Sequence, residues 1–102
     1  MSAVREQVTT VSKEMGITHQ EFYSELPTLL DGVAYRHSQN IISFQLNRKQ
    51  VEIQLAPEGS RELGRSMRLP VTMVTLRFFD FTEAEVNGFI KHFNLRFMKG
   101  GG

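Results

Sequence analysis

The chain has 102 residues, of which 40% are hydrophobic and 23% charged, with a formal net charge of +1 and no cysteine. This length and composition predict one globular α+β domain spanning residues 1–102. The absence of cysteine excludes disulfides, thiol nucleophiles and cysteine-ligated zinc or iron–sulfur sites. No apolar run approaches the ~18 residues of a membrane span, and the first residues lack the pattern of a secretory signal. We therefore expect a cytoplasmic protein that does not enter a membrane.

Charge is distributed unevenly along the chain. Residues 1–31 carry two basic and five acidic side chains, a net of −3, whereas residues 32–102 carry ten basic and six acidic side chains, a net of +4. Such an asymmetry can mark an anion-binding half. The simpler interpretation, which we favour, is that the helices and strands are solvated by charges of either sign.

The first predicted element is a helix over residues 2–15. Val4, Val8, Val11 and Met15 share one helical stripe. Gly16 follows at the position where a left-handed C-cap is expected. The stripe is narrow and contains several poor helix formers, so we expect this helix to depend on docking for its stability.

The second predicted helix has a stronger start signal. Thr18 and Glu21 form a capping box, with Ile17 and Phe22 in the positions of a hydrophobic staple. Pro27 lacks an amide proton and predicts a kink, or a short second turn beginning there. The apolar side of this helix consists of Phe22, Leu26, Leu29 and Leu30, and the segment ends at residues 31–32.

Three short strands are predicted next, from Val33 to His37, Ile41 to Leu46 and Gln50 to Leu55. Their period-2 alternation indicates one buried and one wet face. Residues 38–40 and 47–49 read as hairpin turns, so the three strands should form a meander. The inward set is Ile42, Phe44, Leu46, Val51, Ile53 and Leu55.

The stretch at residues 56–69 is the longest without convincing periodicity, and we interpret it as a long loop. A fourth strand then runs from Val71 to Phe79, opened by Pro70. Its alternation places Val74, Leu76 and Phe78 on one face and Met73, Thr75 and Arg77 on the other.

The last predicted helix begins with a second capping box, formed by Thr82 and Glu85, and a second staple. Leu95 and Phe97 alternate beyond the helix and form a candidate final short strand, while residues 98–102 are expected to be a flexible tail. The staple is Phe81 with Val86, and the helical stripe is Val86, Phe89, Ile90 and Phe93.

The predicted order is therefore α-α-β-β-β-β-α, with the candidate final strand after it. Runs of strands flanked by helices favour an α+β fold with the helices on one face of an antiparallel sheet of about four strands. The strand order is left open by the sequence, because the long loop permits a simple meander or a shuffled sheet.

One candidate binding feature is an arginine-rich loop. Arg61, Arg65 and Arg68 fall within eight residues and are interspersed with glycine and serine. Guanidinium groups match phosphate and carboxylate geometry, and glycines let backbone amides approach an anion. The segment is not a phosphate-binding P-loop, because the required lysine is absent. We weigh an anion site formed by these arginines and Arg77 against a solvated loop neutralised by nearby glutamates, which we favour.

The outer face of the predicted sheet is a second candidate. It presents Arg36, Ser43, Gln45, Glu52, Gln54, Met73, Thr75 and Arg77. Sheet faces that read single-stranded RNA carry aromatic residues for stacking, whereas Phe44 and Phe78 should point inward here. A solvated face is the simplest interpretation, and a homodimer surface is an alternative.

Catalysis and metal binding have little support. The histidines, His19, His37 and His92, have no metal-ligand spacing, and no nucleophile elbow occurs. A small enzyme would need a pocket between the second helix and the sheet, for which Tyr23, Tyr35 and His37 are candidate lining residues. The Gly100–Gly102 run suggests a ubiquitin-like carrier, but such carriers begin with a β-hairpin rather than helices.

We therefore expect a non-enzymatic binding or protein-interaction module without a cofactor, whose partner is a protein, a second copy of the chain or an anionic ligand. Nucleic-acid binding through the same arginines is the first alternative, and a small enzyme or a ubiquitin-like carrier is the second.

Overall fold

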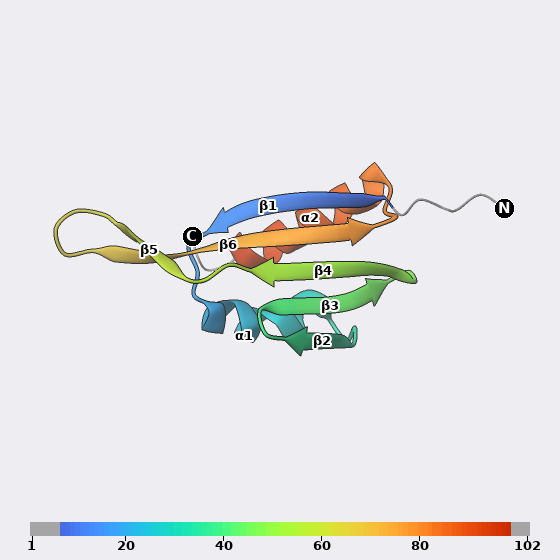
Figure 1. Cartoon of the computed structure of the whole chain (residues 1–102), viewed down its shortest axis with the longest axis horizontal. Helices are drawn as coiled ribbons and strands as arrows, with labels where there is room; N and C mark the ends of the chain where they lie inside the picture. Colours follow the sequence, from blue (N-terminus) through green and yellow to red (C-terminus); the bar gives the residue numbers. More distant parts are fainter. Residues whose placement is uncertain (1–6, 99–102) are drawn as a thin grey trace.

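The computed structural model describes residues 7–98 (Figure 1). Within them an antiparallel sheet of six strands and two helices form an α+β fold, which confirms the predicted class. In chain order the elements are β1 (Val8–Met15), α1 (His19–Leu30), β2 (Tyr35–Ser38), β3 (Ile41–Leu46), β4 (Lys49–Leu55), β5 (Gly59–Glu62), β6 (Arg68–Phe79) and α2 (Glu83–Met98).

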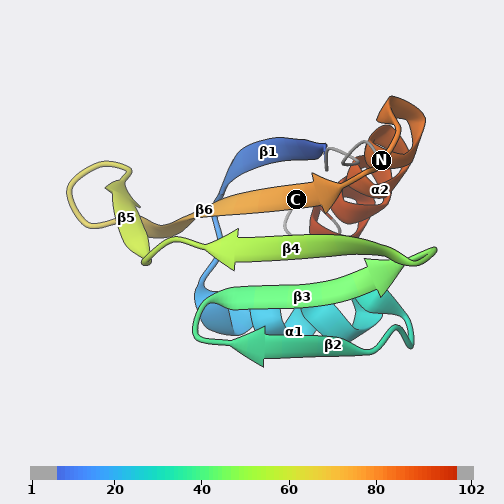
Figure 2. The same cartoon turned by 45° about the vertical axis from the view of Figure 1, so that its right-hand side comes forward.

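The main sheet has the order β1-β6-β4-β3-β2, and β5 pairs with the outer part of β6 (Figure 2). Strands β2, β3, β4 and β6 therefore form the simple meander, and the alternative of a shuffled sheet is wrong. Both helices lie on the same side of the sheet (Figure 1). The chain crosses from one sheet edge to the other through α1, which lies between β1 and β2 in sequence.

The predicted helix over residues 2–15 is wrong for its described part, which is strand β1; Val4 lies outside the described residues. The i, i+4 spacing of Val11 and Met15 fits a strand as well as a helix. Four residues are two full repeats of a strand, and they are close to one turn of a helix, so in both cases the two side chains share a face. Val11 lies opposite Leu76 of β6. The valines and threonines of β1 are β-branched, and such residues favour strands. Pairing with β6 therefore overrides the helical stripe.

The predicted capping boxes are confirmed at both helices. In α1 the Glu21 amide donates to Thr18 Oγ1 (3.0 Å) and the Thr18 amide donates to Glu21 Oε1 (2.8 Å). The same reciprocal pair joins Thr82 and Glu85 ahead of α2. Helix α1 continues through Pro27 to Leu30, so no separate second turn begins at the proline.

The end of α2 corrects a second expectation. Leu95 and Phe97 belong to this helix and not to a final strand. Phe97 packs beside Phe93, four residues earlier, with ring centroids 4.6 Å apart. Two aromatic residues separated by one helical turn share a helix face. The i, i+2 alternation of Leu95 and Phe97 spans only three residues and does not indicate a strand. Met98, the first residue of the expected tail, is the last residue of α2, and residues 99–102 lie outside the described residues.

The hydrophobic core lies between the sheet and the two helices. The predicted inward residues of the four strands are buried, except Leu46, which is partly buried and packs against the core. The core residues are Phe22, Leu26, Leu29 and Leu30 from α1, Ile42, Phe44, Val51, Ile53, Leu55, Val74, Leu76 and Phe78 from the sheet, and Val86, Phe89 and Phe93 from α2. Neither α1 nor α2 is long and apolar enough to cross a membrane.

Residues 56–69 correct the third expectation, because most of this predicted loop is a β-hairpin. Strand β5 pairs with the beginning of β6 from Gly59 opposite Val71 to Glu62 opposite Arg68. The hairpin extends past the ends of the other strands (Figures 1 and 2). We call residues 59–71 the arm.

Candidate functional site

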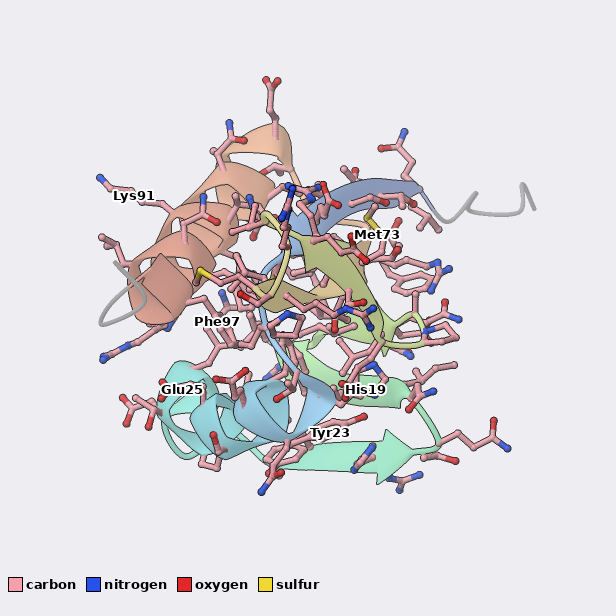
Figure 3. All side chains as sticks on the ribbon, turned by 90° about the vertical axis from the view of Figure 1, so that its left-hand side faces the viewer. His19, Tyr23, Glu25, Met73, Lys91 and Phe97 are labelled. Atoms are coloured by element: carbon pink, nitrogen blue, oxygen red, sulfur yellow. The ribbon has the colours of Figure 1, made fainter. Side chains whose placement is uncertain are left out.

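The sheet face turned away from the helices is lined by polar side chains from all five main strands, and we call it the open face. Residues opposite one another in antiparallel strands share a face, so the register orders the open face in rows. One row reads Thr10, Arg77, Glu52, Ser43 and Arg36. The next reads Ser12, Thr75, Gln54, Ile41 and Ser38. Figure 3 shows Met73 on this face and Phe97 on the helix side.

Two opposite charges lie side by side at the centre of the open face. Arg77 on β6 is opposite Glu52 on β4. They form no ion pair with each other or with another residue in 7–98, where the pairs are Lys49–Glu85, Arg61–Glu14 and Arg68–Glu62. Glu52 instead accepts a hydrogen bond from Gln50 Nε2 (3.2 Å). Both charges therefore remain available to a partner.

The arm carries exposed apolar side chains. Leu63, Met67, Leu69 and the adjacent Met73 are 46%, 59%, 42% and 43% exposed. The Leu63 amide donates to the Met67 carbonyl (2.7 Å), so the hairpin pairing continues to the tip. Alternation along β6 places Leu69 and Met73 on the same side of the strand. The stripe formed by these four residues therefore continues the open face beyond the sheet.

The base of the arm is fixed by three hydrogen bonds to residues 17–19, at the start of α1. Thr72, which is fully buried, donates from Oγ1 to the Ile17 carbonyl (2.7 Å). The His19 ring nitrogen Nε2 is 2.7 Å from the Ala56 carbonyl, and the His19 amide donates to Glu58 Oε2 (2.9 Å). These bonds join the start of α1 to the chain on both sides of the arm. They fix the orientation of the arm relative to the sheet at its base.

The structure does not bring the four candidate arginines together. Arg61 is paired with Glu14 of β1 (2.7 Å), and Arg68 with Glu62 across the hairpin (3.4 Å). Because Arg61 is opposite Leu69, it faces the side of the arm away from Arg68. Arg65 is exposed at the tip. Arg77 is eight residues along β6 from Leu69, a distance of roughly 26 Å.

Tyr23, named above as a candidate lining residue, contacts both His19 and His37. The Tyr23 and His37 rings are 4.3 Å apart, and Tyr23 meets His19 edge-on at 6.4 Å (Figure 3). The Tyr23 hydroxyl has no hydrogen-bond partner among the described residues, and burial raises its pKa. A raised pKa keeps this hydroxyl protonated near neutral pH. Tyr35 lies exposed at the sheet edge.

A hollow of about 760 Å³ lies beside β2 and β3. It includes Arg36, Ser43 and Gln45 of the open face, so it is part of the same surface. The hollow is lined by Val33, Ala34, Tyr35, Arg36, Ser43, Phe44, Gln45 and Gln50. No group of three or more histidine, aspartate or glutamate residues in 7–98 could hold a metal ion.

Sequence reasoning missed the apolar stripe of the arm. A signal was present, because Met67, Leu69, Val71 and Met73 alternate with period 2 and extend the β6 pattern backward across Pro70. The prediction begins the strand after Pro70, but proline is tolerated inside a strand where one side has no neighbouring strand.

Comparison of this chain with models of known protein families, with curated proteins and with solved structures finds no match.

Proposed function

We propose that the protein is a non-enzymatic protein-interaction module that binds its partner through the arm and the open face. The observation that carries this proposal is the stripe of Leu63, Met67, Leu69 and Met73 on a hairpin that projects from the sheet. Exposure of apolar side chains to water is unfavourable, and several of them gathered on a projecting element are typical of a binding surface.

The fixed root of the arm supports the same proposal. A hairpin that is already ordered loses less conformational entropy on binding than a mobile loop, so more of the contact energy appears as affinity. Methionine side chains such as Met67 adapt to irregular surfaces through three rotatable bonds. The arm therefore combines a rigid backbone with adaptable apolar contacts, which suits a protein partner.

Nucleic-acid or anion binding by the arginines has less support from this geometry. Arg61 and Arg68 would have to leave Glu14 and Glu62 to contact a phosphate. At the tip Arg65 provides a single guanidinium group for a phosphate, whereas nucleic-acid affinity comes from several phosphate contacts. The carrier alternative depends on residues 100–102, which lie outside the described residues.

Photo-crosslinking in the native host tests the proposal directly. A photoreactive amino acid replaces Met67 in the arm, and a matched control variant carries it at Leu95, an exposed apolar residue of α2 (64% exposed). We expect discrete protein adducts from position 67 and none of the same mass from position 95. Equal patterns at both positions, or adducts at 67 that disappear on nuclease treatment, would overturn the proposal.

A further inference from the structure

We infer that the partner is a second copy of this chain, packed open face to open face in a symmetric dimer. This inference rests on the proposed function and gives the partner its identity. It starts from Arg77 and Glu52, neighbouring charges of opposite sign at the centre of the open face that make no ion pair among the described residues.

A two-fold axis makes this arrangement self-complementary. Homodimers are mostly isologous, so each residue pair across the interface occurs twice. If the axis lies between the two sheets, parallel to the strands and midway between β6 and β4, each β6 lies over the other copy's β4. Arg77 of each copy then faces Glu52 of the other, and both charges are paired on both sides of the axis.

The neighbouring row fits the same axis. Thr75 is opposite Gln54 within one copy, so each threonine hydroxyl would face a glutamine amide of the other copy. The flanking positions of the two rows are Thr10 and Ser12 on β1 and Ser43 and Ile41 on β3, three of which are small. Small side chains permit the ~10 Å separation of packed sheets, and aligned packing tolerates the roughly 30° angle that sheet twist produces.

The axis also accounts for the exposed stripe on the arm. Rotation about an axis parallel to the strands leaves both arms at the same end of the dimer. Their open-face sides then meet, with Met67 of one copy near Leu63 of the other, because these two residues are opposite each other in the hairpin. By the same register Arg61, which is opposite Leu69 and paired with Glu14, lies over Leu69 of the other copy, so charged groups border the apolar contact at the arm tips. The contact of the arms and the polar contact of the sheets therefore belong to one interface.

The sizes of the two parts show that both are needed. Five strands at about 4.8 Å spacing and roughly 20 Å length give a flat footprint of roughly 400–500 Å². Stable interfaces bury about 800 Å² of each partner, so the sheet alone falls short. The arm lengthens the contact along the strands and adds its apolar core, which polar sheet rows lack.

The sheet edges are protected against the competing mode of self-association, in which strands pair edge to edge. Lys13 of β1 is opposite Val74, so it points to the helix side of the sheet. An inward-pointing charge is a common means of blocking an edge strand. At the other edge β2 has only four residues, all exposed. Face-to-face packing is therefore favoured over edge pairing.

Exchanging the charges at positions 77 and 52 tests the proposed axis. The full chain is studied by sedimentation velocity at about 50 µM, a concentration above the micromolar dissociation constants of weak interfaces of this size. We expect the natural chain to sediment at twice its mass of 11.7 kDa. Arg77→Glu alone and Glu52→Arg alone each place like charges across the axis twice. Each should raise the dissociation constant at least about 100-fold.

The decisive sample is an equimolar mixture of the two variants, because every Glu at position 77 then faces an Arg at position 52 and the reverse pair is restored as well. We expect the mixture to form dimers although neither variant does so alone, which a folding defect could not produce. The double variant Arg77→Glu/Glu52→Arg should also dimerise by itself.

A natural chain that sediments as a monomer, or a mixture that stays monomeric, would overturn this inference. Crosslinking at position 67 separates that failure from failure of the proposed function. Adducts of twice the chain mass support the dimer, and adducts with a different protein keep the interaction module but reject the second copy. Absence of specific adducts rejects both.

Discussion

Phe22 of α1 and Phe97 of α2 form a stacked pair, with ring centroids 4.8 Å apart and ring planes 13° from parallel. Phe97 also contacts Phe93, whose ring lies 4.6 Å away. The last turn of α2 is therefore attached to α1, which positions both helices as one layer behind the open face.

Replacing Phe97 with alanine should lower the free energy of unfolding by about 2–3 kcal/mol, somewhat less than the ~3–5 kcal/mol of a fully buried phenylalanine, because this ring is only partly buried. Urea denaturation followed by circular dichroism measures the change. Leu95→Ala is the control, and as a substitution on an exposed helix surface it should alter stability by less than about 0.5 kcal/mol. Equal effects would show that Phe97 does not hold α2.

Phe89 provides a test of the predicted helix face at the centre of the core. Its ring lies 5.7 Å from Phe78 and 6.0 Å from Phe44, so it joins α2 to strands β6 and β3. Phe89→Ala should cost about 3–5 kcal/mol of unfolding free energy, measured by thermal and urea denaturation. The neighbouring exposed Lys91 gives the control Lys91→Ala. A loss below about 1 kcal/mol would contradict the burial of this ring.

Glu85 should give the folded state a measurable dependence on acid pH. Hydrogen bonds from Lys49 Nζ (2.7 Å) and from the Thr82 amide (2.8 Å) hold the pKa of the Glu85 carboxyl below its usual value of 4.5. A lowered folded-state pKa contributes stability that is present above pH 4.5 and is lost as the pH falls through the lowered value.

The measurement compares the pH dependence of the melting temperature in the natural chain and in Glu85→Gln. The variant should be less stable near neutral pH, and the difference between the two proteins should shrink below pH 4.5. Glu83→Gln, two residues earlier in α2 and exposed, serves as the matched control. A constant difference across this range would mean that the Glu85 carboxylate is not the stabilising group.

Strong local signals in the sequence predicted much of the fold correctly. Thr18 with Glu21 and Thr82 with Glu85 satisfy backbone amides within four residues, so these helix starts do not depend on distant contacts. The inward residues of β3, β4 and β6 follow a period of two that a helix cannot imitate over six residues. Both the capping boxes and the period-2 pattern depend on residues close together in the sequence, and the structure confirms both.

The errors arose where a distant partner decides the structure. Val11 and Met15 fit either a helix or a strand, and pairing with β6, more than fifty residues away, selects the strand. The sequence of the arm predicts a loop because β5 contains only polar residues and glycine, whereas its pairing with β6 makes it a strand. For the candidate site, the sequence located the arginines and predicted neutralisation by Glu58 and Glu62, of which Glu62 pairs with Arg68, but it did not indicate that Glu14 of the distant strand β1 pairs with Arg61.

The turn between β3 and β4 offers a stabilising substitution. Asn47 and Arg48 both have positive φ, 50° and 68°, as the central residues of a type I′ turn require. Glycine adopts this conformation without the steric cost that an arginine incurs. Arg48→Gly should therefore raise the free energy of unfolding by roughly 0.5–1 kcal/mol, measured by urea denaturation. Arg48→Val, which adds a β-branched side chain at positive φ, should lower it, and the opposite order would contradict the turn assignment.

Lys13 is expected to keep β1 from pairing with the edges of other molecules. It points to the helix side of the sheet opposite Val74, where an apolar residue would be accepted by the neighbouring core. Lys13→Val should leave the melting temperature unchanged or higher, because valine favours strands. It should also produce species larger than a dimer that grow with protein concentration, because the inward charge that blocks edge pairing is gone. Light scattering over a concentration series measures this growth, with Lys13→Arg as the control that retains the charge. If Lys13→Val and Lys13→Arg show the same size distribution, β1 is protected by something other than the charge of Lys13.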